Sequence, residues 1–388
     1  MARTRLTVLG DLPVEQFLRN FWQKKPVVIR GAFPDFRDPL PADDLAGLAC
    51  ESGVDSRLVM ERGGPHAWQV TRGPFTPGTL RKLPRSHWTL LVESVDRHSD
   101  EIGLLASAFS FLPKWRIDDV MVSLAPIGGT VGAHVDSYDV FLIQGAGRRR
   151  WQVDGRAQPE YCPGLDLRIL KKFRVEDEWI LDPGDMLYVP PGVGHRGVTV
   201  PGNAPIAITY SVGFRAPSAA DLVAAIGARM TRSAAPSLFS DRGRRRASDP
   251  GEISLRDIRS LRRFLIREMA TRNKDEWALA VGEAVTSGSF ARPGATRPSA
   301  REVAKRLVRG DLFHPAPEAR MSWCRLSSRR VALFVNGESR VLPPGDAFAA
   351  SILCGRSSPS GARRLGARPA LAALAAGLLR HHVLRWQH

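Results

Sequence analysis

The chain has 388 residues and a formal net charge of +17 at pH 7, and its length allows two or three domains with a core in each. Its four cysteines (Cys50, Cys162, Cys324 and Cys354) are far apart and form no Cys-x-x-Cys pair, which argues against a disulfide framework and structural zinc and favours a reducing cytosol. No apolar run has the length of a signal peptide or a membrane span, so we expect a cytoplasmic protein without membrane association.

The first half of the chain predicts a mixed α and β domain. Residues 14–22 have the apolar spacing of a helix, and residues 26–30 are predicted to form a strand. Residues 118–215 alternate short apolar segments with turns rich in Gly and Pro, a pattern typical of a jelly roll. We therefore expect an α+β fold with a double-stranded β-helix (jelly roll) of the cupin type at its core.

His134 and Asp136 are separated by one residue. On a strand, residues i and i+2 point to the same side, so both side chains can reach one metal ion. Two histidines and one carboxylate are the ligands of mononuclear non-haem iron(II) sites, which leave positions open for substrate and O₂. Because a His-x-Asp pair also occurs by chance in many proteins, this interpretation needs a second histidine in a suitable context.

His195 has that context. It follows the sequence Asp182-Pro-Gly-Asp-Met-Leu-Tyr-Val-Pro-Pro-Gly-Val-Gly, in which the first Pro-Gly predicts a turn and Met-Leu-Tyr-Val a short buried strand. The Pro-Pro-Gly segment then predicts a second turn that leads to the histidine. Strand, turn and histidine in this order are typical of the second half of a cupin metal site, so we predict that His134, Asp136 and His195 bind iron(II).

Arg149 lies in the segment Gly147-Arg-Arg-Arg-Trp-Gln-Val153, after a turn predicted at Gln144-Gly-Ala-Gly147. With the period of a strand, Arg149, Trp151 and Val153 face the core, and the residues between them face outwards. A buried arginine needs an anionic partner, and its planar fork suits a carboxylate. That partner is either an internal Asp or Glu or a co-substrate such as 2-oxoglutarate, and the predicted iron site favours the co-substrate.

The segment Gly132-Ala-His-Val-Asp-Ser-Tyr-Asp-Val-Phe-Leu-Ile-Gln-Gly-Ala-Gly-Arg-Arg-Arg-Trp151 resembles the JmjC-type ribosomal oxygenases. Supporting matches are Phe21-Trp-Gln-Lys-Lys-Pro-Val-Val28, Trp115-Arg-Ile-Asp-Asp119, Pro183-Gly-Asp-Met-Leu-Tyr-Val-Pro-Pro-Gly192 and Tyr210-Ser-Val-Gly-Phe-Arg-Ala-Pro217. The resemblance is dense from about residue 10 to residue 220 and thinner beyond.

The resemblance implies a JmjC fold with His134, Asp136 and His195 as iron ligands and Arg149 on the 2-oxoglutarate carboxylate. It further implies a dioxygenase that hydroxylates an arginine of the large-subunit ribosomal protein L sixteen and releases succinate and CO₂. A guanidinium substrate needs an acidic or aromatic cradle, for which the candidates are Asp118, Asp119, Tyr138 and Asp139. Each of these four could instead be an ordinary strand-end or turn residue.

The second half of the chain predicts helices and one hairpin. Residues 219–230 and 253–272 have helical apolar spacing and are separated by a polar loop at about 231–251, and residues 286–300 resemble a linker. Asn336-Gly337 between two apolar segments predicts a hairpin with a type I′ turn, and residues 369–379 a terminal amphipathic helix. By resemblance, residues 1–217 form the catalytic domain, residues 218–290 a helical region that makes a homodimer, and residues 291–388 a winged-helix-like domain.

The positive charge belongs to the second half of the chain. Residues 1–215 carry a net charge of +1 and residues 216–388 one of +16. One arginine cluster comprises Arg242 and Arg244–Arg246, and a second comprises Arg256, Arg259, Arg262, Arg263 and Arg267. Such a surface could contact ribosomal RNA, although the Ala, Arg, Gly and Pro bias also fits a GC-rich genome that places arginine on solvated faces.

Other function classes remain open at the level of sequence. The same fold could hydroxylate a histidine of a ribosomal protein or demethylate a lysine, and the polarity of the substrate pocket would discriminate these reactions. A non-enzymatic metal-binding cupin in ribosome assembly would need neither the intact triad nor an inward arginine. A cupin-type isomerase would need neither the arginine fork nor oxygen.

Overall fold

The computed structural model describes residues 8–61, 68–165, 167–232, 237–242, 251, 253–288, 298–327 and 329–387. The chain divides into two compact units, Met1–Ala216 and Pro217–His388. Within the described residues, no helix is both long and apolar enough to cross a membrane.

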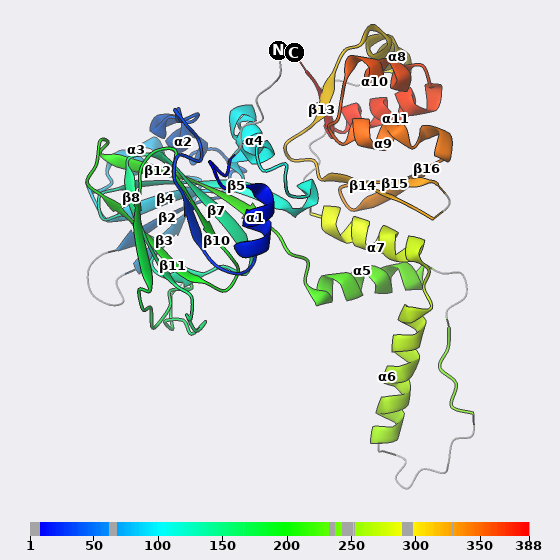
Figure 1. Ribbon diagram of the computed structural model, residues 1–388, viewed down its shortest axis with the longest axis horizontal. Helices are drawn as coiled ribbons and strands as arrows, with labels where there is room; N and C mark the ends of the chain where they lie inside the picture. The colour runs from blue at the N-terminus through cyan, green and yellow to red at the C-terminus, as the bar shows by residue number, and fades with distance from the viewer. Residues whose placement is uncertain are drawn as a thin grey trace. The chain divides into compact units, whose positions relative to one another are not determined.

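The first unit is built mainly of strands (Figure 1). They are β1 (Val27–Ile29), β2 (Ser56–Glu61), β3 (Trp68–Arg72), β4 (Trp88–Val92), β5 (Ile117–Pro126), β6 (His134–Val135), β7 (Asp139–Ala146), β8 (Arg148–Asp154), β9 (Asp177–Leu181), β10 (Met186–Val189), β11 (Gly194–Val200) and β12 (Ile206–Phe214). Its α-helices are α1 (Val14–Asn20), α2 (Ala42–Leu48), α3 (Pro77–Arg81) and α4 (Asp100–Ser107), and short 3-10 turns occur at Val95–Arg97 and Lys114–Arg116.

These strands form two antiparallel sheets. The larger sheet has the order β1-β10-β7-β12-β5-β4-β2-β3, and the smaller one the order β6-β11-β8-β9. From β6 onwards the chain passes back and forth between the two sheets. Strands β6, β8, β9 and β11 belong to the smaller sheet, and β7, β10 and β12 belong to the larger one. This is the expected α+β fold with a double-stranded β-helix core, and the prediction is confirmed.

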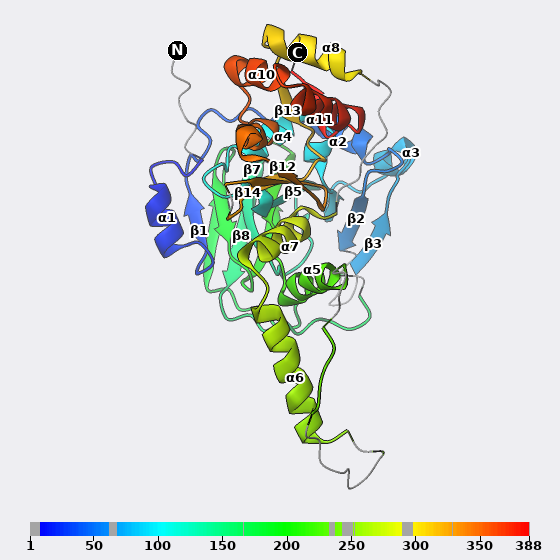
Figure 2. The same cartoon turned by 90° about the vertical axis from the view of Figure 1, so that its right-hand side faces the viewer.

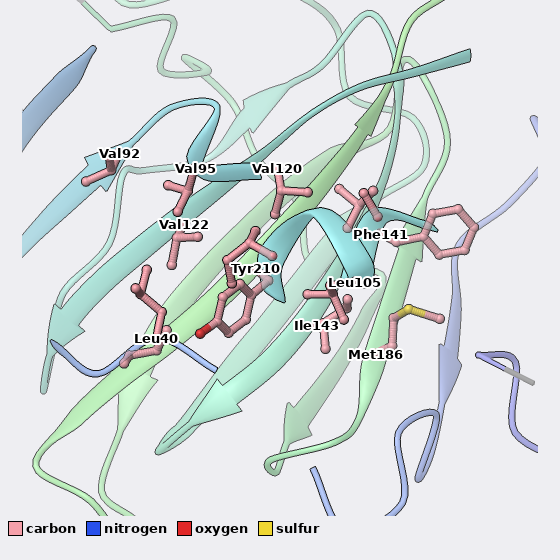
Figure 3. Packing of buried hydrophobic residues seen from close by; sticks show 14 of the residues in the cluster. Leu40, Val92, Val95, Leu105, Val120, Val122, Phe141, Ile143, Met186 and Tyr210 are labelled. Carbon is pink, nitrogen blue, oxygen red and sulfur yellow. The ribbon is translucent and has the colours of Figure 1, made fainter. Parts of the chain in front are cut away.

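Two apolar layers follow from the period-two pattern of the strands. On β7, Val140 and Leu142 pack between the sheets with Trp151 and Val153 of β8. Phe141 and Ile143 point to the opposite face, where helices such as α4 cover the larger sheet. Figure 3 shows this outer layer, with Leu105 of α4 over the sheet residues Val120, Phe141 and Ile143. The inner layer is therefore the one that can enclose a site.

The second unit contains most of the helices. They are α5 (Ala219–Thr231), α6 (Leu255–Ala270), α7 (Lys274–Thr286), α8 (Ala300–Arg309), α9 (Phe348–Leu353), α10 (Pro359–Gly366) and α11 (Pro369–Arg380). Its strands are β13 (Phe313–Pro315), β14 (Met321–Arg325), β15 (Val331–Val335), β16 (Glu338–Leu342) and β17 (Leu384–Trp386), with a 3-10 turn at Pro344–Asp346. Strands β14, β15 and β16 form one sheet, and β13 pairs with β17.

Local sequence explains where the helices of this unit begin. Ser218, Asn273 and Ser299 each accept a hydrogen bond from the backbone of the third helical residue, and the acidic side chain at that position bonds back, which makes three capping boxes. Helix α6 extends away from α5 and α7 in both views (Figures 1 and 2). Its side chains Leu255, Ile258, Leu261, Leu265 and Ile266 are exposed, whereas α8, α10 and α11 share a buried core.

Most predicted elements are present within one or two residues. Helix α5 covers the predicted 219–230, α6 lies inside 253–272, and α11 covers 369–379. The hairpin is confirmed, because Asn336 and Gly337 both have positive φ (51° and 85°), as a type I′ turn requires. Helix α7 was not predicted. Of the predicted linker 286–300, residues 289–297 lie outside the described residues, as do Arg244–Arg246.

One predicted turn is wrong. Gln144-Gly-Ala was expected to be a turn, but β7 continues to Ala146, and Gly147 alone, with φ of 62°, connects it to β8. The ladder between β7 and β12 shifts register between Gln144 and Ala146, so Gly145 lies in a bulge inside the sheet rather than in a turn. Gln144 is consequently a buried strand residue.

Candidate metal and co-substrate site

His134, Asp136 and His195 meet at one end of the smaller sheet. His134 on β6 pairs directly with His195 on β11, and the centroids of their rings are 4.2 Å apart. Nε2 of His195 lies 3.5 Å from Oδ2 of Asp136, and one ligand atom from each of the three residues lies within 4.8 Å of the others. The predicted second turn helps to fix Asp136, because Gly192 N donates to the Asp136 carbonyl oxygen at 2.9 Å.

The backbone sets the orientation of both imidazoles. Nδ1 of His134 donates to the Gly132 carbonyl at 3.0 Å, and Nδ1 of His195 donates to the Val193 carbonyl at 3.2 Å. Each Nε2 is then the atom with a free lone pair, the arrangement typical of metal-binding histidines. Burial, together with the charge of His134, lowers the pKa of His195 to about 4. His195 is therefore neutral at pH 7, the form that binds a metal.

Arg149 lies farther along the same inner face. It pairs with Thr199 of β11, whereas Val153, four residues further on, pairs with His195. Four residues of strand correspond to roughly 13 Å, a gap that the arginine side chain and a small dicarboxylate can share. The predicted strand parity is confirmed, because Arg149, Trp151 and Val153 are 2%, 5% and 1% exposed.

The guanidinium of Arg149 contacts only neutral acceptors among the described residues. Nη1 donates to Ser123 Oγ (3.0 Å) and to Thr209 Oγ1 (3.4 Å), and Nη2 donates to the Gly197 carbonyl (3.4 Å). Nε is buried without a hydrogen-bond partner. Burial alone lowers the pKa of this guanidinium to about 10. The site therefore holds a buried positive charge for which the described residues provide no carboxylate.

Gly197 makes room for this charge. A Cβ atom at position 197 would lie 2.6 Å from Arg149 Nε and 2.7 Å from the Trp151 ring. The centre of the Arg149 guanidinium also lies 5.1 Å from the centroid of that ring. Strand β11 thus approaches β8 closely enough to hold the arginine against the indole only because residue 197 has no side chain.

The four candidate substrate residues fall into two groups. Asp119 and Tyr138 both border the inner face at Gly213, whose Cβ would lie 3.6 Å from Asp119 Oδ1 and 3.7 Å from the Tyr138 ring. Burial and the negative charges of Asp136, Glu93 and Asp119 raise the pKa of Tyr138 well above its usual value. Tyr138 therefore lies close enough to Asp136 of the triad to interact with it electrostatically, and Asp119 lies near Tyr138.

Asp118 and Asp139 have other partners. Asp118 pairs with Arg215, with 3.0 Å between Oδ1 and Nη2. Asp139 is fully buried on the outer side of the sheet, where its carboxylate accepts hydrogen bonds from Tyr188, Gln23 and Arg116. The structure does not bring these two residues together with His134, Asp136 and His195.

Sequence reasoning missed several residues at the site. Glu93 follows the apolar segment 88–92, pairs with Arg57 at 2.5 Å and interacts electrostatically with Asp119. Ser123, Thr209 and Gln144 are polar side chains within otherwise apolar strands. An isolated polar residue in a fully buried strand is the signal that could have identified all three, because such a group needs a partner in the interior.

The sequence and the fold were compared with known proteins. The family model of the JmjC domain matches residues 104–222. Ribosomal protein uL16 3-hydroxylase of Escherichia coli (strain K12) is 40% identical over 252 residues, which cover 64% of this chain and 65% of that protein. A probable ribosomal oxygenase of Haemophilus influenzae is 41% identical over 214 residues, 54% of this chain and 51% of the relative.

Solved structures match over almost the whole chain. The X-ray structure of E. coli ycfD has a TM-score of 0.85 and 31% sequence identity, and the match covers 97% of this chain and 99% of that one. The structure of YcfD, a ribosomal oxygenase from E. coli, in complex with cobalt and 2-oxoglutarate has a TM-score of 0.83 at 31% identity, covering 98% and 99%.

The fold and the constellation of two histidines, one aspartate and a buried arginine define a JmjC-type domain. Within that class, this chain belongs to the family of ribosomal oxygenases.

Proposed function

We propose that this protein is an iron(II)- and 2-oxoglutarate-dependent dioxygenase that hydroxylates an arginine side chain of the large-subunit ribosomal protein uL16 (L sixteen). The observation that carries the proposal is Arg149, a buried cation without a carboxylate partner among the described residues, on the same sheet face as His195. A simple metal-binding cupin would have no use for this charge, and burying it without an anion costs stability.

His134, Asp136 and His195 would hold iron(II) through the two Nε2 atoms and a carboxylate oxygen. Arg149 would bind the far carboxylate of 2-oxoglutarate, and O₂ would be the second co-substrate. Bound iron supplies the redox chemistry that couples decarboxylation of 2-oxoglutarate, to succinate and CO₂, with insertion of one oxygen atom of O₂ into a substrate C–H bond. The protein's own contribution is orientation and exclusion of water by the apolar layer between the sheets.

The polarity of the adjoining surface supports an arginine substrate over a histidine. Burial raises the pKa values of both Glu93 and Asp119, in spite of the Arg57 charge beside Glu93. Two carboxylates with raised pKa values are stabilised when a cation approaches them, and a guanidinium also matches their geometry. Tyr138 offers an aromatic ring beside them. The relative from E. coli, named for hydroxylation of uL16, supports the choice of protein.

The test is mass spectrometry of purified uL16 after incubation with the protein, iron(II), ascorbate and 2-oxoglutarate. We expect a gain of one oxygen atom on an arginine, with succinate formed in parallel, and neither change with His134→Ala. A mark on a histidine, or loss of a lysine methyl group from another protein, would replace the arginine assignment. Bound iron without turnover of any ribosomal protein would favour a non-enzymatic cupin.

We also propose that residues 218–290 mediate a homodimer and that residues 291–388 form a winged-helix-like domain. The apolar side chains Ile258, Leu261, Leu265 and Ile266 of α6 are 44–53% exposed. Such a stripe on a helix that extends away from its neighbours is typical of an interaction face. In the second domain, α8, α10 and α11 share one core with the sheet β14-β15-β16.

The arginines of α6 are proposed to contact ribosomal RNA. Arg256, Arg259, Arg263 and Arg267 follow one another at helical spacing, and none of them forms an ion pair with another described residue. Replacing these four by glutamine should weaken binding of an RNA duplex and lower the dependence of its affinity on salt. An affinity and salt dependence equal to those of the unaltered protein would reject the contact.

A further inference from the structure

Gln144 is a buried polar residue that the proposed reaction does not contact directly. It lies on β7 with its side chain inside the first unit and 0% exposed. Its Nε2 atom donates to the carbonyl oxygens of Ala146 (2.7 Å) and Ile208 (3.3 Å). Its Oε1 atom accepts a hydrogen bond from Thr209 Oγ1 at 3.2 Å.

Thr209 links Gln144 to Arg149. The same hydroxyl that donates to Gln144 accepts a hydrogen bond from Arg149 Nη1 at 3.4 Å. A hydroxyl has one donor hydrogen and two acceptor lone pairs. When Gln144 takes the hydrogen, only lone pairs remain for the guanidinium. Gln144 itself has no freedom to reverse its amide, because its NH₂ group donates to the backbone carbonyls of Ala146, Gly147 and Ile208.

The consequence is a fixed chain of hydrogen bonds, in which Arg149 donates to Thr209 and Thr209 donates to Gln144. Without the Gln144 acceptor, the Thr209 hydroxyl could turn its hydrogen toward Arg149 and repel it. Nη1 of Arg149 would then keep only Ser123 as a hydroxyl partner. Because the chain is buried from end to end, water is not available to replace the lost bond.

We infer that Gln144 is a positioning residue for 2-oxoglutarate: it orients the Thr209 hydroxyl, which in turn holds the Arg149 guanidinium ready for the carboxylate of the co-substrate. This inference rests on the proposed function, since it assumes that Arg149 binds 2-oxoglutarate. Gln144 does not touch the metal ligands or the co-substrate, so its effect is on co-substrate affinity.

Gln144 also has a structural role, and the test must separate its effect on stability from its effect on 2-oxoglutarate affinity. Its Nε2 atom satisfies carbonyls next to the register shift between β7 and β12. Losing those bonds lowers stability whatever happens at Arg149. Stability alone therefore cannot test the inference, and the coupling between Gln144 and Thr209 is the informative quantity.

The experiment measures the dissociation constant of 2-oxoglutarate by calorimetry on protein loaded with Mn(II) and kept free of O₂. Gln144→Leu and Thr209→Val should each weaken binding by about three- to tenfold. The double variant should bind no more weakly than Thr209→Val alone, because Gln144 acts through that hydroxyl. Thr209→Ser retains the hydroxyl and should restore affinity to within about twofold of the unaltered protein. The affinity for Mn(II) should not change in any variant.

Gln152→Leu is the matched control, since it removes an amide of β8 that bonds Glu178 on the exposed side. Losses that multiply in the double variant would overturn the inference, as would a Gln144→Leu protein with reduced stability and unchanged 2-oxoglutarate affinity. If Gln144→Leu does not fold, Thr209→Val against Thr209→Ser still decides whether the hydroxyl serves Arg149. Failure of the unaltered protein to bind 2-oxoglutarate would instead overturn the proposed function, and this inference with it.

Discussion

Arg149 carries a positive charge into the interior, where its hydrogen-bond partners among the described residues are hydroxyl and carbonyl oxygens. A charge held in this way is less stable than one paired with a carboxylate, and the lowered pKa of the group records that difference. A ligand carboxylate would supply the missing partner. The ion pair that a core arginine usually forms with an internal Asp or Glu is therefore available to the co-substrate.

Arg149→Ala should retain the metal site and lose affinity for 2-oxoglutarate. A charge-assisted hydrogen bond contributes about 1.5–3 kcal/mol, so the KM for 2-oxoglutarate should rise by at least about tenfold. The KM of Arg149→Lys for 2-oxoglutarate should lie between those of the unaltered protein and Arg149→Ala, because lysine keeps the charge and loses the planar fork. Steady-state succinate release against 2-oxoglutarate concentration measures both, and an unchanged KM for Arg149→Ala would remove this residue from the co-substrate site.

The two-residue period of strands predicted the positions of His134, Asp136 and Arg149. The same period explains why Asp118 and Asp139 lie apart from the triad. His134 and Asp136 share a face because they are two residues apart, and Arg149 was placed inward by the same period. Asp139 begins β7 and shares a face with Phe141 and Ile143, the outer side of the larger sheet, where Tyr188 and Arg116 bind it. The same rule separates Asp118 from Asp119.

At the scale of elements, the approach of β11 to β8 determines whether Arg149 fits. Gly197→Ala should place a methyl group against Arg149 Nε and the Trp151 ring. Overpacking of this kind costs about 1–3 kcal/mol, so both the free energy of unfolding and the affinity for 2-oxoglutarate should decrease. Gly227→Ala in α5, where a Cβ meets no atom within 4 Å, is the control and should be neutral or slightly stabilising. Denaturant unfolding and calorimetry of each variant provide the comparison.

The turn Val95–Arg97 before α4 contains Asp96, a buried carboxyl group whose titration can be tested. Asp96 accepts a hydrogen bond from Val120 N of β5, and burial raises the pKa of its carboxyl to about 6. Because the folded-state pKa is above the unfolded value, the protonated form is favoured in the fold. Its contribution to stability is complete below about pH 4 and is lost as the pH rises through about 6.

Asp96→Asn should therefore flatten the dependence of the unfolding free energy on pH between 4 and 6. The measurement is urea unfolding at several pH values, with the unaltered protein alongside. A slope in that window that is the same for both proteins would show that Asp96 titrates normally.

Local patterns predicted isolated elements better than their pairing. The hairpin at Asn336-Gly337 and the strand Met186–Val189 were found from turn residues and apolar runs within a few positions. The length of β7 was not, because its end depends on a register shift against β12, which is 60 residues away in sequence. Ser123 and Thr209 lie beside Arg149 because β5 pairs with β12, a long-range pairing that no local pattern contains.

For the whole molecule, the division of charge and exposed apolar surface points to assembly through the second unit. Leu261→Asp together with Leu265→Asp would place two charges on the half-exposed stripe of α6. We expect these changes to convert a dimer to a monomer in light scattering, because burying unpaired carboxylates at an interface costs several kcal/mol. The substitution Arg256→Asp, on the side of the helix opposite this stripe, should leave the mass unchanged. A monomeric unaltered protein at micromolar concentration would contradict the dimer.

The measurement that tests the central claim most directly uses isotopically labelled O₂. Purified uL16 would be incubated with the protein, iron(II) and 2-oxoglutarate under labelled O₂ and then mapped by mass spectrometry. We expect one labelled oxygen atom on an arginine, one succinate formed for each mark, and no mark with His134→Ala. Unlabelled oxygen in the product, or an equal mark with His134→Ala, would contradict an oxygenase centred on His134, Asp136 and His195.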